Sequence, residues 1–398
     1  MRHIELLFGV LTITAVILVC ALALPTVAAD SEKKPAEEKG QAEVLAEFNI
    51  EKGERVILLP VKFQEREWLF LLDTGISQSM SDVSLRKFLG KPIQVEDVLT
   101  VAAELVRVEF FNPPEAFLGK LDLREGGPMG CTDLETLRRV TGREVRGLLG
   151  MAFLKKYVVR IDFDSGKVQF RPWDARDHPE WGSAVYLYEG VGNPGGVPLT
   201  KANLTGAGDI KFIIDSGCNG AGKLVTDVFE KAMDKMAVAE CLTTTLAGEH
   251  RFRETRIRHL ALGGFEHRGL AMGEMNQNLI GLGLLSRYVV TLDFPAMKTY
   301  LQKGQAFDRP DEIDMSGLHL WRLAGRTVVE SVDKSSPAEV AGIESEDVVL
   351  KVGETSATEM DLGDLRDLLK SGDGKEIKMT IRHGEEEKAV SFRLKKQI

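Results

Sequence analysis

Hydrophobic residues along the chain are grouped mostly in short runs that are separated by polar or glycine-rich turns. VILLPVKF (residues 56–63) and WLFLL (residues 68–72) are two such runs, with the polar residues QERE between them. Apolar runs of this length, bounded by polar turns, are typical of β-strands. We therefore predict a β-hairpin that ends at Asp73, in a chain that is mainly β.

The same pattern occurs twice. FLLDTGIS (70–77) recurs as FIIDSGCN (212–219), 142 residues later. Downstream, GLLGMAFLKKYVVRIDF (147–163) recurs as NLIGLGLLSRYVVTLDF (278–294), 131 residues later. An Asp-Thr-Gly after a strand is by itself ordinary turn chemistry. Two kinds of motif that recur in the same order instead indicate an internally duplicated chain.

The segment from residue 315 onward has a different pattern, with five short strand-like runs and two short helical stretches. It resembles a PDZ domain through Ser336-Pro337-Ala338 and Ala341-Gly342-Ile343. One departure is Glu346, where that family usually has a glycine before the residue corresponding to Asp347. We expect this departure to alter a turn and to leave the fold intact.

Residues 46–305 resemble the two-lobed, retropepsin-like aspartic proteases of the pepsin superfamily. The resemblance implies tandem β-barrel lobes that form a pseudo-dimer, at residues 46–175 and 176–305, followed by the PDZ domain at 315–398. It implies that Asp73 and Asp215 are the catalytic residues. The residues that it places in support of them are Thr74, Gly75, Ser216, Gly217, Gly150 and Gly281.

Two carboxyl groups about 3 Å apart cannot both ionise, so they share a proton; aspartic proteases are the standard example of this behaviour. The ionised acid can take a proton from a water molecule while the protonated acid donates to the substrate carbonyl. This chemistry needs no cofactor, metal or nucleophilic side chain. The sequence also has no CxxC or HExxH spacing that would indicate a zinc site.

The chain departs from the pepsin-type pattern at two points, the dyad and the flap that would cover it. Ile76 and Cys218 stand where pepsin-type enzymes often have a hydroxyl residue that favours the charged carboxylate. We therefore expect a dyad that works closer to neutral pH than that of pepsin. A flap tyrosine is missing before Tyr157, and we place a flap hairpin between about Val98 and Phe111 without locating its tip.

The N-terminus and the charge bear on location and partners. Residues 1–29 predict a signal peptide, although Leu6–Leu24 are long enough to serve as a signal anchor, and residues 30–45 predict a charged linker. We expect an extracytoplasmic protein, periplasmic or secreted, that contacts a membrane only if the N-terminal segment is retained. A net charge of −9 argues against nucleic acid as a partner. After cleavage, Cys131, Cys218 and Cys241 would leave at least one free thiol.

The function predicted from these features is that of an exported aspartic endopeptidase with a polypeptide substrate. For the PDZ domain we expect capture of peptide C-termini at Gly317, Leu318, His319 and Leu320; the alternative is that it packs against the lobes and gates access. One rival for the whole chain is a non-catalytic, bilobal peptide-binding scaffold. The other is a PDZ-linked serine protease. The chymotrypsin order would need a histidine well upstream of the serine, and this chain has none between His3 and His178. We expect His250, His259 and His267 to be solvated.

Overall fold

The computed structural model describes residues 43–50, 56–100, 104–186, 188–189, 196–233, 235–245 and 248–398. The predicted signal peptide and most of the predicted linker lie outside the described residues. Ala42–Ile398 form one compact unit. The described part of this unit is mainly β, as the sequence predicts, and its strands form four sheets.

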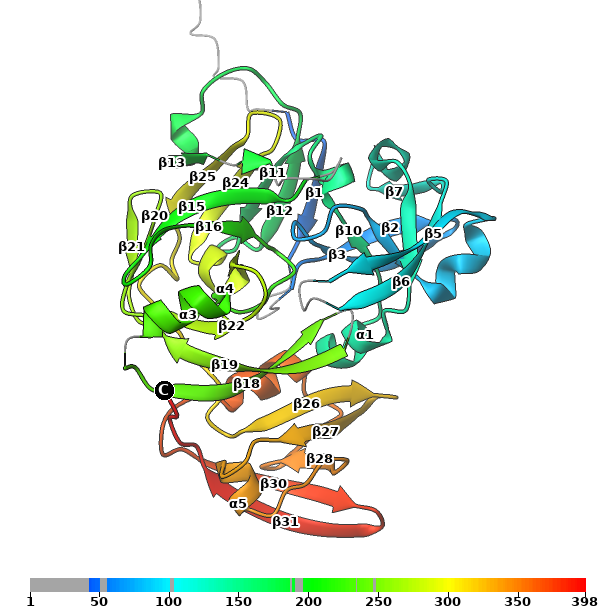
Figure 1. The fold of residues 1–398 in the computed structure, drawn as a ribbon. Helices are drawn as coiled ribbons and strands as arrows, with labels where there is room; N and C mark the ends of the chain where they lie inside the picture. The colour runs from blue at the N-terminus through cyan, green and yellow to red at the C-terminus, as the bar shows by residue number, and fades with distance from the viewer. Residues whose placement is uncertain are drawn as a thin grey trace, which may run out of the picture. The chain divides into compact units, whose positions relative to one another are not determined.

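The first lobe contains a nine-stranded sheet (Figure 1). Its strands are β2 (Leu58–Phe63), β3 (Arg66–Leu72), β4 (Met80–Asp82), β5 (Pro92–Leu99), β6 (Leu105–Phe111), β7 (Ala116–Leu118), β8 (Leu121–Asp122), β9 (Met129–Thr132) and β10 (Val145–Leu149). Strands β2 and β3 form the predicted hairpin. Along the sheet the order is β5-β6-β9-β4-β10-β3-β2-β7-β8.

The second lobe repeats this sheet. Its strands are β15 (Pro198–Leu204), β16 (Gly208–Ile214), β17 (Gly222–Leu224), β18 (Val238–Thr245), β19 (Gly248–Arg256), β20 (Leu260–Leu262), β21 (Phe265–His267), β22 (Ala271–Glu274) and β23 (Leu279–Ile280), with β14 (Tyr188–Glu189) paired to β15. Their order is β18-β19-β22-β17-β23-β16-β15-β20-β21, which matches the first sheet position by position. The parallel pairs β3/β10 and β4/β9 likewise have parallel counterparts in β16/β23 and β17/β22.

A third sheet joins the two lobes. Its order is β1 (Ala46–Asn49), β12 (Lys167–Arg171), β11 (Val158–Asp162), β24 (Tyr288–Asp293), β25 (Lys298–Lys303) and β13 (Ser183–Tyr186). The central antiparallel pair consists of the two repeated Tyr-Val-Val strands, and Arg160 pairs with Thr291, its own repeat counterpart. Arg160 also donates a hydrogen bond to Thr291 Oγ1 at 3.2 Å. The repeats therefore meet about a local two-fold axis.

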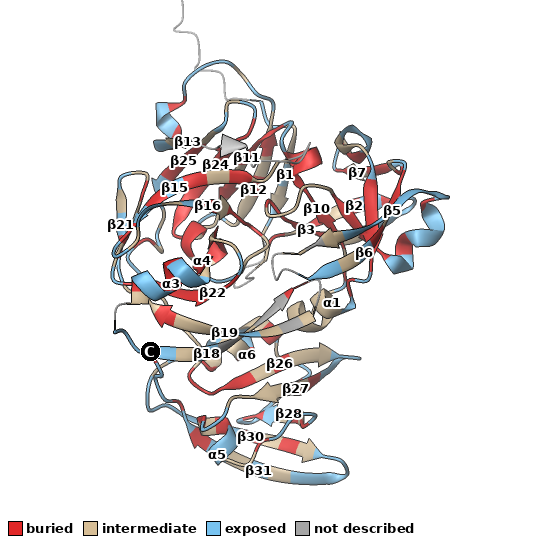
Figure 2. Cartoon of the chain, viewed as in Figure 1, coloured by how far each residue is buried: buried red, intermediate tan, exposed pale blue. Residues whose placement is uncertain are grey.

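Burial follows from the position of each strand. Every residue of β24 is buried, because the strand is central in its sheet, whereas β2 alternates between buried and more exposed residues (Figure 2). One large apolar cluster draws on both lobes, with Phe63, Phe170 and Phe229 among its fully buried members.

Short helices connect the strands of the lobes. They are the α-helices α1 (Glu135–Thr141), α2 (Met151–Leu154), α3 (Thr226–Met233) and α4 (Leu282–Leu285), and the 3-10 helices η1 (Val83–Phe88), η2 (Leu123–Gly126) and η3 (Pro179–Trp181). Helices α2 and α4 begin directly after Gly150 and Gly281, at equivalent points of the two repeats. None of the helices in the described part of the chain is long and apolar enough to cross a membrane.

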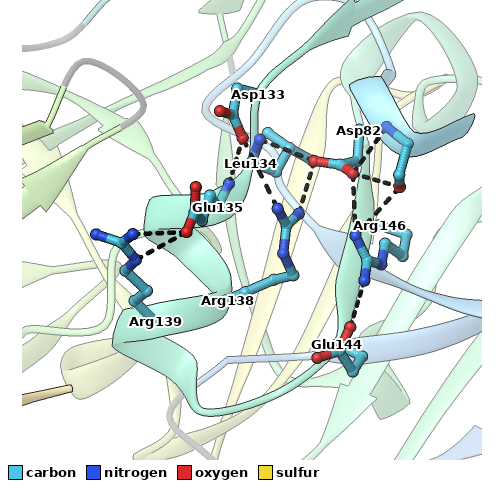
Figure 3. Close-up of polar contacts among 9 residues, drawn as sticks. Asp82, Asp133, Leu134, Glu135, Arg138, Arg139, Glu144 and Arg146 are labelled. Atoms are coloured by element: carbon cyan, nitrogen blue, oxygen red, sulfur yellow. Dashed lines mark hydrogen bonds and ion pairs between the residues drawn. The ribbon is translucent and has the colours of Figure 1, made fainter. Parts of the chain in front are cut away.

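Helix α1 is anchored to the first sheet by a buried carboxylate, that of Asp82 at the end of β4 (Figure 3). Asp82 accepts hydrogen bonds from the Leu134 amide at 3.0 Å and from the guanidinium groups of Arg138 at 2.6 Å and Arg146 at 3.1 Å. It also accepts from the Ser84 amide and so caps η1. Burial opposes ionisation of Asp82, but the hydrogen bonds from Ser84, Arg138 and Leu134 outweigh it and lower its pKa to about 2.

The C-terminal module has its own sheet and apolar core. Its elements are β26 (Leu318–Leu323), β27 (Arg326–Val332), α5 (Pro337–Val340), β28 (Val348–Val352), β29 (Thr355–Ser356), α6 (Leu362–Leu368), β30 (Glu376–His383) and β31 (Glu386–Arg393). The sheet order is β26-β27-β28-β30-β31, with the two-residue β29, which the sequence did not predict, paired to β28. Glu346 has a φ of +72°, a left-handed conformation that glycine adopts most easily, so this unusual residue occupies a turn without changing the fold around it.

Candidate active site

Each Asp-Thr/Ser-Gly turn follows a buried strand and is held by the neighbouring parallel strand. The amide of Asp73 donates to the carbonyl of Leu149 at 3.0 Å, and the amide of Asp215 donates to that of Ile280 at 2.9 Å. Parallel strands end at the same edge of a sheet. Strands β3 and β16 therefore deliver their acidic residues to the edges where β10 and β23 also end.

The two turns are interlocked through their hydroxyl residues. The Thr74 amide donates to Ser216 Oγ and the Ser216 amide donates to Thr74 Oγ1, both at 3.0 Å. Thr74 Oγ1 donates to the Ile214 carbonyl at 2.6 Å, and Ser216 Oγ donates to the Leu72 carbonyl at 2.8 Å. Both hydroxyl residues are buried. Four hydrogen bonds between the lobes therefore fix the position of each turn relative to the other.

This interlock places the two carboxyl groups next to each other. The Gly75 amide donates to Asp73 Oδ1 and the Gly217 amide to Asp215 Oδ1, both at 2.8 Å. A Cβ atom on Gly75 would lie 2.6 Å from Asp215 Cγ, and one on Gly217 would lie 2.7 Å from Asp73 Cγ. Any side chain at either glycine would therefore collide with the carboxyl group from the other lobe.

Burial raises the pKa of both acids. For Asp73 the charge of Asp215 adds to the effect of burial, and its pKa lies well above the usual range although the Gly75 amide opposes this shift. For Asp215 burial raises the pKa to about 6, while hydrogen bonds from Gly217, Cys218 and Asp73 oppose the increase. The acids interact directly and titrate as a pair.

Gly150 and Gly281 pack closely against the backbone that follows the two turns. A Cβ atom on Gly150 would lie 2.5 Å from the Gln78 carbonyl oxygen, and one on Gly281 would lie 2.4 Å from the Gly220 carbonyl oxygen. The Gly150 amide also donates to Ser79 Oγ at 3.1 Å. Ser79 is a buried supporting residue that the sequence comparison missed, because the second lobe has no hydroxyl residue at the matching point of its repeat.

Asp73 and Asp215 line a cavity of about 890 Å³ to which both lobes and the C-terminal module contribute. The flap is predicted between Val98 and Phe111, where the structure has the paired strands β5 and β6; residues 101–103 lie outside the described residues. A second hairpin, β18 and β19, occupies the equivalent position in the second lobe, and the sequence did not predict it. The carboxylate of Glu104 lies 3.4 Å from His250 Nε2, so the two hairpins meet.

One buried histidine departs from the expectation, and a second is held by stacking and hydrogen bonds. His267 is buried and hydrogen-bonded to the Tyr288 hydroxyl, so the expectation that it is solvated is wrong. Its neighbours are the aromatic residues of the second lobe, and burial lowers its pKa to about 4. His178 stacks on Trp181, with ring centroids 3.6 Å apart, and its ring nitrogens contact Asp174 and Glu180.

These contacts bear on the serine-protease alternative. The hydroxyl of Ser216 is committed to the Leu72 carbonyl, and His178 is held by partners in its own loop. The structure therefore does not bring His178 to Ser216. Cys131 and Cys218 are free thiols, and burial raises the pKa of Cys218 to about 12. In the described part of the chain, no group of three or more His, Cys, Asp or Glu side chains is placed to hold a metal.

The residues predicted to bind peptide in the PDZ domain lie at the start of β26, which is an edge strand. They are Gly317, Leu318, His319 and Leu320, and all four line the cavity that contains the two acids. The side chains of Leu318 and Leu320 are buried in the core of the module. His319 Nε2 lies 2.9 Å from Asp333 Oδ1.

Helix α1 of the first lobe packs against the same edge strand. Arg366 of α6 donates hydrogen bonds both to the Val140 carbonyl in α1 and to the Leu320 carbonyl in β26, each at 2.6 Å. The guanidinium group of Arg139 lies over the ring of Trp321 at 5.3 Å. A peptide that added to β26 as a strand would therefore have to share the Leu320 carbonyl with Arg366.

Comparison with known proteins assigns the C-terminal module. Residues 328–383 match the PDZ domain family, so the predicted PDZ domain is confirmed over this range. The matched range begins after Gly317–Leu320 and leaves the two lobes unassigned. No curated protein is significantly similar to the chain.

Two solved structures are similar to a part of this chain. A photosystem II D1 C-terminal processing protease is 20% identical over 24% of this chain and 26% of that chain, with a TM-score of 0.21. A PDZ domain protein from Parabacteroides distasonis is 22% identical over 21% of this chain and 20% of that chain, with a TM-score of 0.19. The chain therefore spans about a quarter or less of either protein.

Proposed function

We propose that this chain is an aspartic-type endopeptidase of the two-lobed, retropepsin-like kind, in which Asp73 and Asp215 are the catalytic pair. The observation that carries the proposal is the interlock of Thr74 and Ser216. It brings one carboxyl group from each duplicated half into contact on the wall of a cavity that both lobes line. The buried pair, with both pKa values raised, matches the state that shared-proton catalysis requires.

In the proposed mechanism Asp215 is the base and Asp73 is the acid. Ionised Asp215 removes a proton from a water molecule, whose oxygen attacks the carbonyl carbon of the scissile peptide bond. Protonated Asp73 donates to the carbonyl oxygen, and a tetrahedral diol results. The carbon–nitrogen bond then breaks as the nitrogen accepts a proton from Asp215, Asp73 regains its proton from the diol, and an acid and an amine are released.

The proposed substrate is an extended polypeptide that lies between the lobes under the hairpins β5/β6 and β18/β19. The PDZ residues Gly317–Leu320 line the same cavity as the two acids, which supports a role for the PDZ domain in holding one end of the substrate or in limiting access. The apolar run Leu6–Leu24 supports export from the cytoplasm, with the protein either released or anchored by that segment.

The test is peptide cleavage by purified protein without its first 29 residues, measured by mass spectrometry on a peptide library with and without pepstatin. We expect pepstatin-sensitive cleavage, and a loss of about 10²–10⁴-fold in rate in both Asp73→Asn and Asp215→Asn. Asp227→Asn, which changes an exposed aspartate on α3, is the matched control and should keep full activity. Cleavage that persists in both dyad variants would refute the proposal. Peptide binding without any cleavage by the wild type would identify the non-catalytic scaffold instead.

A further inference from the structure

The duplicated strand order allows the two walls of the cavity to be compared residue by residue. Met80 in β4 pairs with Leu148, and Lys223 in β17 pairs with Leu279, which is the repeat counterpart of Leu148. Met80 and Lys223 also pair with Gly130 and Gly273 on the parallel neighbours β9 and β22. Met80 and Lys223 are therefore equivalent positions.

The side chains at these positions lie in the same place. A Cβ atom on Gly130 would lie 2.3 Å from Met80 Sδ, and one on Gly273 would lie 2.6 Å from Lys223 Nζ. In both lobes a glycine on the neighbouring strand leaves room for a long side chain that lines the cavity. In the first lobe this side chain is apolar, whereas in the second lobe it ends in an ammonium group.

A second pair of equivalent positions differs in the same way. Phe110 in β6 pairs with Gly130, and Glu254 in β19 pairs with Gly273. Both residues line the cavity. The two lobes have thus kept the same backbone while a methionine and a phenylalanine in one correspond to a lysine and a glutamate in the other.

The lobe-1 wall, which we define as Leu71, Met80, Val108, Phe110 and Leu148, belongs to one buried apolar cluster. All five residues also line the cavity that contains the two acids. A bulky apolar side chain that lies against this wall would bury its surface without leaving a polar group unpaired.

The lobe-2 wall, which we define as Lys223, Glu240, Glu254, Asp311 and Glu312, has four carboxyl groups and one ammonium group. Lys370 of the C-terminal module also lines the cavity, so the four carboxyl groups still outnumber the two ammonium groups. Asp311 is held against the second lobe because the Ala271 amide donates to it at 2.8 Å. Lys223 Nζ lies beside Gly273, the residue with which Glu254 pairs, so the two side chains are neighbours. Burial raises the pKa of Glu254, the charge of Lys223 opposes this shift, and smaller effects come from Asp311, Lys370 and Arg256.

We propose that the two walls select different substrate side chains: a bulky apolar residue on the lobe-1 wall, and a lysine or arginine on the lobe-2 wall, where Glu254 is the determining residue. This inference rests on the proposed function and specifies its substrate class. A basic side chain would add a positive charge where carboxylates outnumber the ammonium groups. An acidic side chain would be repelled, and an apolar one would remove water from charged groups without replacing their hydrogen bonds.

The test compares peptides that differ only in lysine or norleucine at one position beside the scissile bond, on either side of a bulky apolar residue. Norleucine keeps most of the aliphatic stem of lysine and lacks the charge. For the wild type we expect kcat/KM to favour lysine about tenfold in one of the two arrangements. Glu254→Gln should remove this preference. Lys223→Met should increase it, because Lys223 then no longer competes with the substrate lysine for the Glu254 carboxylate.

The control is Glu96→Gln, which removes one carboxylate from the lobe-1 side of the same cavity and should leave the lysine preference unchanged. If Glu254→Gln does not fold, the increase expected for Lys223→Met decides the question alone. A wild type that cleaves no peptide overturns the proposed function and this inference with it. A wild type that cleaves without preferring lysine, or a loss of preference that is equal in Glu96→Gln, overturns this inference and leaves the proposed function standing.

Discussion

At the scale of single residues, the properties of the acid pair depend on the atoms that surround it. The Gly75 and Gly217 amides stabilise the charged carboxylates, while burial favours the protonated form of both acids and the charge of Asp215 adds to this effect at Asp73. Burial is the larger effect in both cases. The residues that follow the turns, Ile76 and Cys218, add no hydroxyl group to offset it.

The raised pKa values predict a pH profile with its acid limb near neutral pH. The base of the proposed mechanism is lost when the pair binds its second proton. Because burial raises the pKa of Asp215 to about 6, activity should rise as the pH increases through about 6. Cys218→Ser should move this limb to lower pH, because a hydroxyl can donate to Asp215 and favour its charged form. The measurement is kcat/KM against pH for both proteins. A wild-type optimum below about pH 4 would contradict the prediction.

At the scale of elements, helix α1 is held to the first sheet by Asp82 through Arg138 and the Leu134 amide. A buried carboxylate that is fully hydrogen-bonded contributes to stability only while it is ionised, and removing its charge takes away the buried acceptor that Arg138 and Arg146 share. The folded-state pKa of Asp82, about 2, lies below the value near 3.9 of an unfolded chain. The stabilisation is therefore complete above about pH 4 and is lost as the pH falls through about 2.

Asp82→Asn should lower the free energy of unfolding by about 3 kcal/mol at pH 7. The difference from the wild type should narrow as the pH falls from about 4 towards 2, because the wild-type carboxylate then becomes protonated as well. Asp133→Asn is the matched control, since Asp133 is exposed and lies 3.8 Å from the same Arg138; we expect a change of less than about 1 kcal/mol. Urea unfolding at several pH values measures both. A pH-independent difference would show that the charge of Asp82 is not the cause.

The elements also show what the sequence can reveal. The hairpin of β2 and β3 was predictable because its strands are short apolar runs with a polar turn, and the acids at 73 and 215 stood out because their motif recurs. The hairpin of β18 and β19 was missed because VAECLTTT has no regular alternation of apolar and polar residues and GEHRFRETR is polar, with Phe252 as its one large apolar residue. The anchoring of α1 by Asp82 joins residues more than 50 positions apart, and no local pattern encodes such a contact.

At the scale of the whole molecule, the duplicated halves share one sheet, and the PDZ domain contacts both of them, the first through α1 and the second through Arg251, which donates to Asp333 at 2.9 Å. Helix α1 joins the first half to the PDZ domain, because Asp82 holds Arg138 on one face while Val140 and Arg139 contact Arg366 and Trp321. The edge of β26, where peptide capture is predicted, is thus the edge that faces the first lobe. The two predicted roles of the PDZ domain, peptide capture and gating, therefore involve the same contact.

Arg366→Ala should loosen the contact between the PDZ domain and the first lobe, because Arg366 donates to carbonyls on both sides of it, at Val140 and Leu320. We expect faster amide hydrogen exchange in α1 and β26 in the variant, and tighter binding of peptides with a free C-terminus, because the Leu320 carbonyl becomes available to an added strand. Arg393→Ala is the control, since Arg393 also donates to a carbonyl, that of Gly374, but within the PDZ domain. Mass spectrometry measures the hydrogen exchange, and calorimetry measures the binding of the peptide. Unchanged exchange in α1 would mean that Arg366 does not hold the PDZ domain to the first lobe, and faster exchange without tighter binding would mean that the contact serves only to position the PDZ domain.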